Sequence, residues 1–175
     1  MATPVILPRL MSIGENACDE IPSILASLHL RRPLIVTDRM MVQLRYATRI
    51  VDTLASAGIE ADVFDDTVPE PTVASISAGV KYAKKGDFDC IIGLGGGSPI
   101  DSAKAIAVLA RHGGQMRDYK YPRITNDAGL PLIAVPTTAG TGSEVTRFTI
   151  ITDEATDEKM LCVGLAFMPM AALMR

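Results

Sequence analysis

Short aliphatic runs alternate with stretches of helical spacing through most of the chain, and this alternation limits the possible folds more than any other feature. Parallel strands that helices cover on both faces read as unbroken aliphatic runs, and strand–helix–strand units join them. We therefore expect an α/β fold with a parallel sheet flanked by helices. The expected strands lie at residues 34–36, 60–64, 88–93 and 131–135.

Apolar residues recur at helical spacing between these runs and before the first of them. This spacing predicts helices over residues 16–29, 40–57, 73–85 and 99–112. The last part of the sequence differs, because residues 146–152 and 159–164 alternate in the manner of strands around a polar turn. We expect these two segments to form a β-hairpin appended to the sheet.

Composition narrows the functional classes. A chain of 175 residues with 48% hydrophobic residues has room for one domain with a real core. The net charge of -3 and the lack of a basic run argue against nucleic-acid binding. No apolar stretch approaches the roughly 18 residues of a membrane span, and no secretory signal begins the sequence. Three scattered cysteines outside any CxxC pair suit buried thiols in the cytoplasm.

A glycine-rich segment, Gly93-Leu-Gly-Gly-Gly-Ser-Pro99, joins an expected strand to an expected helix. Glycines let the backbone approach an anion closely, and the first turn of a helix aims free N–H groups at it. Ser98 is the expected N-cap, Pro99 the first helical residue, and Asp101 the acceptor of a capping box. The segment differs from GxGxxG and from a P-loop, so a simple tight turn stays an alternative.

Two further polar groups follow strands. Asp38 ends the run Leu34-Ile-Val-Thr-Asp38, and the segment Thr137–Glu144, rich in threonine and glycine, follows the run at 131–135. In open α/β sheets, ligands bind just beyond the carboxyl ends of the strands. These groups and the glycines therefore predict one ligand site, although the second loop is also compatible with an exposed turn.

Three segments in this order resemble the N-terminal hallmarks of the iron-containing (metal-dependent) alcohol dehydrogenase family, and the resemblance covers nearly all 175 residues. They are Leu34–Asp38, Gly93–Lys104 and Pro131–Glu144. The resemblance implies a Rossmann-like, dehydroquinate synthase-like N-terminal domain that binds NAD. It implies that residues 1–175 form this NAD-binding domain and that the helical, metal-binding C-terminal domain is absent from the chain.

The resemblance also assigns roles to individual residues. Gly95, Gly96, Gly97 and Ser98 correspond to the loop that binds the cofactor pyrophosphate, and Asp101, in the helix that follows, is also expected to be a cofactor-binding residue. Asp38 corresponds to the acceptor for the adenosine ribose hydroxyls, which favours NAD over NADP. The remaining cofactor-binding residues implied are Thr137, Thr138, Thr141, Thr146 and Phe148 on the nicotinamide side and Lys159 at the nicotinamide ribose. Glu70 departs from the asparagine that is common in the family, so no cofactor contact is carried over to it.

The family holds Fe²⁺ (or Zn²⁺) with one Asp and three His in its C-terminal domain. The segment around Pro169 and Ala172 resembles the approach to that Asp, but the sequence ends at Arg175. His29 and His112 each lack a partner at ligand spacing. We therefore expect no metal ligand and no catalytic residue in the chain, and the metal only in the full-length protein.

The leading hypothesis is the coenzyme-binding part of an NAD-dependent, metal-requiring alcohol dehydrogenase that interconverts alcohols and aldehydes or ketones, inactive as these 175 residues alone. It predicts a small-molecule alcohol or aldehyde substrate, no nucleic-acid or membrane partner, and a homo-oligomer at full length. The alternatives are a maleylacetate reductase or glycerol dehydrogenase relative, and a stand-alone nucleotide-binding module without catalysis.

Overall fold

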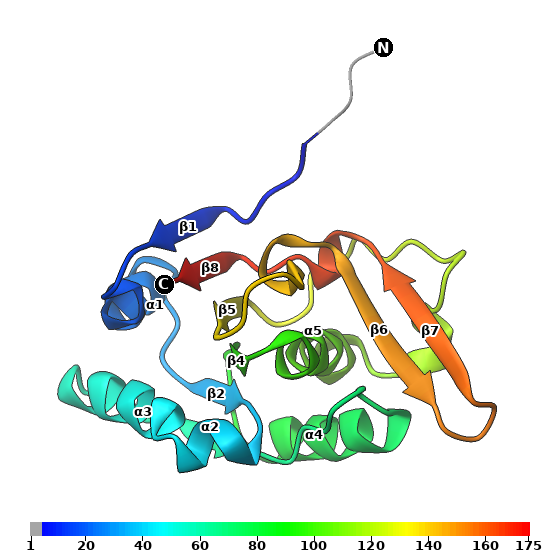
Figure 1. The fold of residues 1–175 in the computed structure, drawn as a ribbon, viewed down its shortest axis with the longest axis horizontal. Helices are drawn as coiled ribbons and strands as arrows, with labels where there is room; N and C mark the ends of the chain where they lie inside the picture. The colour runs from blue at the N-terminus through cyan, green and yellow to red at the C-terminus, as the bar shows by residue number, and fades with distance from the viewer. Residues whose placement is uncertain (1–4) are drawn as a thin grey trace.

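The chain folds around a six-stranded, entirely parallel sheet in a computed structural model that describes residues 5–175 (Figure 1). The strands follow the order β1-β8-β5-β4-β2-β3 across the sheet. The α/β class expected from the sequence is confirmed. The strands are β1 (Leu10–Ile13), β2 (Pro33–Val36), β3 (Asp62–Phe64), β4 (Cys90–Gly95), β5 (Leu132–Pro136) and β8 (Ala171–Met174).

Helices cover both faces of the sheet. Successive side chains of a strand point to opposite faces, so an aliphatic strand presents apolar side chains to the helices on each face. Ile35 and Ile92 pack with α1, α2 and α3, whereas Leu34 and Ile91 pack with α4 and α5. The helices are α1 (Ile21–Ser27), α2 (Arg39–Gln43), α3 (Tyr46–Ser56), α4 (Val73–Lys85) and α5 (Gly97–His112). Each face of the sheet therefore supports its own hydrophobic cluster.

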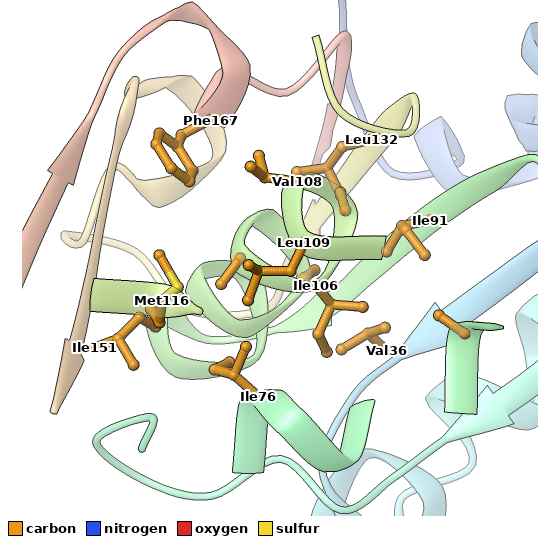
Figure 2. Close-up of a cluster of buried hydrophobic side chains, with 14 of the residues drawn as sticks. Val36, Ile76, Ile91, Ile106, Val108, Leu109, Met116, Leu132, Ile151 and Phe167 are labelled. Carbon is orange, nitrogen blue, oxygen red and sulfur yellow. The ribbon is translucent and has the colours of Figure 1, made fainter. Parts of the chain in front are cut away.

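Helix α5 is buried on nearly every side. The hairpin of β6 (Phe148–Asp153) and β7 (Glu158–Val163) forms a separate two-stranded antiparallel sheet and packs on α5, so that α5 lies between the main sheet and the hairpin (Figure 1). Figure 2 shows Ile106 and Leu109 of α5 in the centre of this cluster, with Ile151 of the hairpin on one side. A helix that is apolar all round requires such a doubly covered position.

Two glycines let α5 lie close to its neighbours. A Cβ atom added to Gly93 would lie 2.8 Å from Cβ of Ala103, and one added to Gly79 would lie 2.3 Å from Cδ1 of Ile106. Both distances are too short for real carbon contacts. Glycine at these positions therefore fixes the distance of α5 from β4 and from α4.

Several expected boundaries differ from the structure. The helix expected over 40–57 is interrupted before Tyr46, because Arg45 adopts a left-handed φ of 65°. The helix expected over 16–29 begins as a 3-10 turn at Ala17–Glu20 and becomes α-helical from Ile21. The expected hairpin strands are shifted by one or two residues, and the hairpin pairs with itself without joining the main sheet.

The sheet also contains two strands that the sequence patterns did not predict. Strands β1 and β8 have four residues each, and β8 inserts between β1 and β5. Separately, among residues 5–175 no helix has the length and apolarity required to cross a membrane.

Candidate functional site

The candidate site lies where the order of the strands reverses direction. From β2 the chain moves to β3 on one side, whereas from β4 it moves through β5 towards β8 on the other. In open parallel sheets this switch point opens a crevice beyond the carboxyl ends of the strands, and ligands bind there. Asp38 follows β2, and Gly95–Gly97 join β4 to α5, so both expected elements lie at the switch point.

Buried threonines fix the strand ends at this edge. The Thr37 hydroxyl donates a hydrogen bond to the Leu94 carbonyl at 2.8 Å, which ties the end of β2 to β4. The Thr67 hydroxyl donates to the Thr37 carbonyl at 2.8 Å and adds the segment after β3. The loops that leave these three strands therefore start from a rigid edge.

The glycine turn begins α5 earlier than the sequence pattern predicted. Gly96 is the N-cap and Gly97 the first helical residue, so Ser98 and Pro99 occupy the second and third helical positions. The predicted Ser98 N-cap is wrong, as is the predicted capping-box role of Asp101, because glycine at the cap position lets the extended backbone enter the helix directly.

This geometry leaves amide groups free. No side chain caps α5, and within residues 5–175 no hydrogen bond is formed by the amide N–H groups of Gly97 and Ser98. These are the N–H groups that a helix cannot satisfy internally, and they carry the positive end of the helix dipole. The turn therefore offers an anion two donors at the start of a 16-residue helix.

The threonine loop packs directly against the glycines. A Cβ atom on Gly96 would lie 3.2 Å from Oγ1 of Thr138, and one on Gly97 would lie 3.0 Å from Cγ2 of Thr141. The Thr137 amide donates to the Gly95 carbonyl at 2.9 Å. The structure therefore brings the two predicted loops together, and little space is left between the glycines and the threonine loop.

A buried lysine that the sequence reasoning did not single out joins α5 to the hairpin. The side chain of Lys104 is 0% exposed. Its Nζ donates to the Phe148 carbonyl at 2.6 Å and to the carbonyl and hydroxyl of Thr146 at 2.9 and 3.2 Å. Three oxygens around one Nζ match the three protons of an ammonium group. Lys104 thus holds two predicted nicotinamide-side residues at fixed distances from α5.

Asp101 reinforces the same link. Its carbonyl accepts a hydrogen bond from the Thr149 hydroxyl at 2.9 Å, and its carboxylate accepts one from the Ile150 amide at 3.3 Å. Its Oδ1 also lies 3.9 Å from Nζ of Lys104. The predicted role of Asp101 changes accordingly, from capping its own helix to anchoring β6.

Burial shifts the pKa values of both Lys104 and Asp101. It lowers the pKa of Lys104 to about 8, although the carboxylates of Asp101 and Glu144 act in the opposite direction. Burial also raises the pKa of Asp101, against the charge of Lys104 and hydrogen bonds from Ile150 and Ser143. The low polarity around the pair therefore strengthens its electrostatic interaction.

A pocket of about 240 Å³ opens beside the start of α5. Of the predicted residues, it brings together the group Gly97, Ser98, Asp101, Thr141 and Lys159. Thr137 and Thr138 line a different pocket, of about 480 Å³, which includes Leu94 but none of the residues Gly95–Ser98. Thr146 and Phe148 line neither pocket and meet the site through Lys104.

Asp38 is the N-cap of α2, and its Oδ1 accepts a hydrogen bond from the Met41 amide at 2.9 Å. Asp38 is partly buried and lies at the switch point but lines neither pocket beside the glycine turn. One carboxylate oxygen thus has a structural role, and the other forms no hydrogen bond within residues 5–175.

Comparison with known proteins decides the family. The sequence model for iron-containing alcohol dehydrogenase matches residues 8–175. The chain belongs to the iron-containing alcohol dehydrogenase family. Alcohol dehydrogenase 4 from Saccharomyces cerevisiae (strain YJM789) is 36% identical over 171 residues, which are 98% of this chain and 45% of that protein. The NAD-dependent methanol dehydrogenase of Bacillus methanolicus is 32% identical over the same shares of both chains.

Solved structures of the family have the same fold. A 1,3-propanediol oxidoreductase superposes with a TM-score of 0.94 at 30% identity, over 99% of this chain and 46% of that one. The sulfoacetaldehyde reductase of Bifidobacterium kashiwanohense, in complex with NAD+, gives a TM-score of 0.91 at 31% identity, over the same shares. The chain therefore spans less than half the length of these relatives and corresponds to their N-terminal part.

The family name raises the question of iron. No group of three or more His, Cys, Asp or Glu side chains in residues 5–175 is placed to hold a metal ion. Nε2 of His112 lies 3.2 and 3.0 Å from the carbonyl oxygens of Asp127 and Ala128. These described residues therefore do not fit an iron site.

Proposed function

We propose that residues 1–175 are the coenzyme-binding domain of an NAD-dependent alcohol dehydrogenase. The observation that carries the proposal is the glycine turn at the switch point of the sheet, where the Gly97 and Ser98 amides form no hydrogen bond within residues 5–175 and both residues line a pocket. Family membership and the NAD+ complex of one structural neighbour support the same ligand. The cofactor supplies the hydride chemistry once it is bound.

In this proposal, the residues of the site divide the binding between them. The Gly95–Ser98 turn holds the pyrophosphate, and Asp38 accepts hydrogen bonds from the adenosine ribose. Lys159 contacts the nicotinamide ribose. Lys104 positions the hairpin, and Asp101 both positions the hairpin and lines the cofactor site. Thr137, Thr138, Thr141, Thr146 and Phe148 complete the nicotinamide side.

The metal requirement of the enzyme is a separate part of the proposal. We assign the Fe²⁺ (or Zn²⁺) site to a helical C-terminal domain that these 175 residues do not contain, because the described residues do not fit one. We therefore expect the 175-residue chain alone to have no alcohol dehydrogenase activity. The substrate belongs to the alcohols and aldehydes, in a cytoplasmic, homo-oligomeric protein at full length.

The glycine turn gives a direct test. Gly96 has an extended backbone with φ of -77°, which any residue adopts, so Gly96→Val places a branched side chain in the turn without backbone strain. That side chain lies where the pyrophosphate approaches and close to Thr138. We expect at least tenfold weaker NADH binding by calorimetry, with the helical circular dichroism of the wild type. Unchanged NADH affinity in a folded variant contradicts the proposal.

A further inference from the structure

Glu70 has an unusual backbone conformation. Its φ is 52°, in the left-handed region that few residues other than glycine, asparagine and aspartate adopt. The surroundings impose this conformation, because the next residue, Pro71, is buried and its carbonyl accepts a hydrogen bond from the Thr152 amide at 2.8 Å. Strained residues that the structure holds in place in this way concentrate at functional sites.

The Glu70 carboxylate forms an ion pair with Lys159. Oε1 of Glu70 lies 3.3 Å from Nζ of Lys159. The register explains the meeting, because Thr72 forms a parallel bridge with Thr152, and Thr152 pairs with Lys159 across the hairpin. The loop before α4 and the hairpin therefore bring these two charges together although they are far apart in the sequence.

This ion pair lies at the pocket beside the glycine turn. Glu70 and Lys159 both line the 240 Å³ pocket, together with Gly97 and Ser98, whose amides are free. Lys159 is the one lysine or arginine among the lining residues, whereas Glu70 and Asp101 contribute two carboxylates. An anionic ligand at the amides and the Glu70 carboxylate therefore compete for a single cation.

We propose that Glu70 lowers the affinity of this pocket for an anionic dinucleotide by engaging Lys159. The inference rests on the proposed function, since it takes the ligand to be NAD(H). Removal of the carboxylate leaves Lys159 available to the ligand and also reduces the negative charge around the pyrophosphate. Glu70 thus weakens cofactor binding, whereas a residue that contacts the cofactor strengthens it.

The exposure of the ion pair determines how much Glu70 changes the affinity for NADH. The side chains of Lys159 and Glu70 are 62% and 72% exposed, so water and salt screen their interaction. We expect Glu70→Gln to lower the dissociation constant for NADH about two- to fivefold at low salt, as measured by fluorescence titration. The gain should shrink as the salt concentration rises. Glu60→Gln is the matched control, because Glu60 is an exposed carboxylate before β3, whereas the pocket lies beyond the carboxyl ends of the strands.

A double-mutant cycle with Lys159→Met separates the possible causes. We expect the gain from Glu70→Gln to fall below twofold in the Lys159→Met background. An equal or weaker NADH affinity of Glu70→Gln in the wild-type background overturns the inference, and so does a gain of the same size without Lys159. Failure of the wild-type chain to bind NADH contradicts the proposed function instead, so the two failures are distinguishable.

Discussion

At the scale of single residues, two charged side chains have structural roles as well as proposed functional ones. Asp38 caps α2 with one oxygen, and Lys104 joins α5 to the hairpin with three hydrogen bonds. Simple truncation of either residue therefore mixes a loss of stability with a loss of binding. Variants that keep the structural role are needed to separate the two.

The variant Asp38→Asn separates the capping role of Asp38 from its proposed role in binding the adenosine ribose. Asparagine is as good an N-cap as aspartate, so α2 keeps its cap while the negative charge is lost. A carboxylate repels the 2′-phosphate of NADPH and accepts hydrogen bonds from the ribose of NADH, and hydrogen bonds to charged groups contribute about 1.5–3 kcal/mol. We expect the ratio of the NADPH and NADH dissociation constants to fall about tenfold or more in fluorescence titrations. An unchanged ratio limits Asp38 to its capping role.

Lys104 predicts a pH dependence of stability. Its pKa of about 8 in the folded state lies below the roughly 10.4 of an unfolded lysine. Between these values the unfolded state binds more protons, so this residue makes the free energy of unfolding rise with pH, by about 3 kcal/mol at most. Burial raises the pKa of the Cys90 and Cys162 thiols, which has the opposite effect above about pH 8.5.

Comparison of the wild type with Lys104→Met isolates the contribution of the lysine to the pH dependence, because both proteins contain the Cys90 and Cys162 thiols. At pH 7 the variant leaves buried carbonyls without donors, and we expect a loss of about 2–4 kcal/mol in urea denaturation. From pH 8 to pH 10 the wild type should gain stability relative to the variant. Lys81→Met, which changes an exposed lysine of α4, should differ from wild type by less than about 0.5 kcal/mol. A pH-independent difference between wild type and Lys104→Met contradicts the burial of a titrating ammonium.

At the scale of elements, the backbone beside β7 leaves no space for a side chain at Gly164. Gly164 follows β7 with φ of 142°, and a Cβ atom there would lie 1.9 Å from the Thr125 carbonyl oxygen. Gly164→Ala should therefore displace the loop that runs beside β7 and destabilise the protein by about 2–4 kcal/mol in urea denaturation. Gly58→Ala is the control, because its left-handed φ of 73° is strained but nothing lies within 4 Å. It should cost about 1 kcal/mol, and equal costs at the two sites contradict the packing argument.

The elements that the sequence predicted are those with strong local patterns. Helix α4 was predicted with its observed bounds, and the strands β2, β4 and β5 to within two residues, because aliphatic runs and helical spacing are local signals. The edge strand β1 and the inserted β8 were missed, since four residues give little pattern and their pairing is set by distant parts of the chain. The break in the helix at Arg45 and the glycine cap at Gly96 were missed because the local signals favoured other conformations.

Local sequence patterns also made part of the site predictable. The two loops were found because each follows a strand, and the parallel sheet places all strand ends at one edge. The links made by Lys104 and Glu70 were not found, because each depends on how the hairpin packs on α5 and on the loop before α4. Local sequence contains no signal for these tertiary contacts.

At the scale of the whole molecule, the layers place the proposed cofactor site on a rigid framework. The sheet is covered on both faces, and the hairpin covers α5, so the start of that helix is the exposed end of a buried element. The chain has less than half the length of its relatives, and the described residues do not fit a metal site. The proposed coenzyme site is therefore the exposed start of a helix that the sheet and the hairpin hold in place.

The central claim is that NAD binds at the glycine turn, and an NMR titration of the 175-residue chain tests it most directly. We predict that NAD shifts the amide signals of Gly96, Gly97 and Ser98 most strongly, followed by those around Asp38 and Thr138. The Gly96→Val chain should show none of these shifts at the same NAD concentrations. Absence of shifts at the turn in the wild type, or shifts confined to another surface such as the groove beside Lys81 and Met116, contradicts the account.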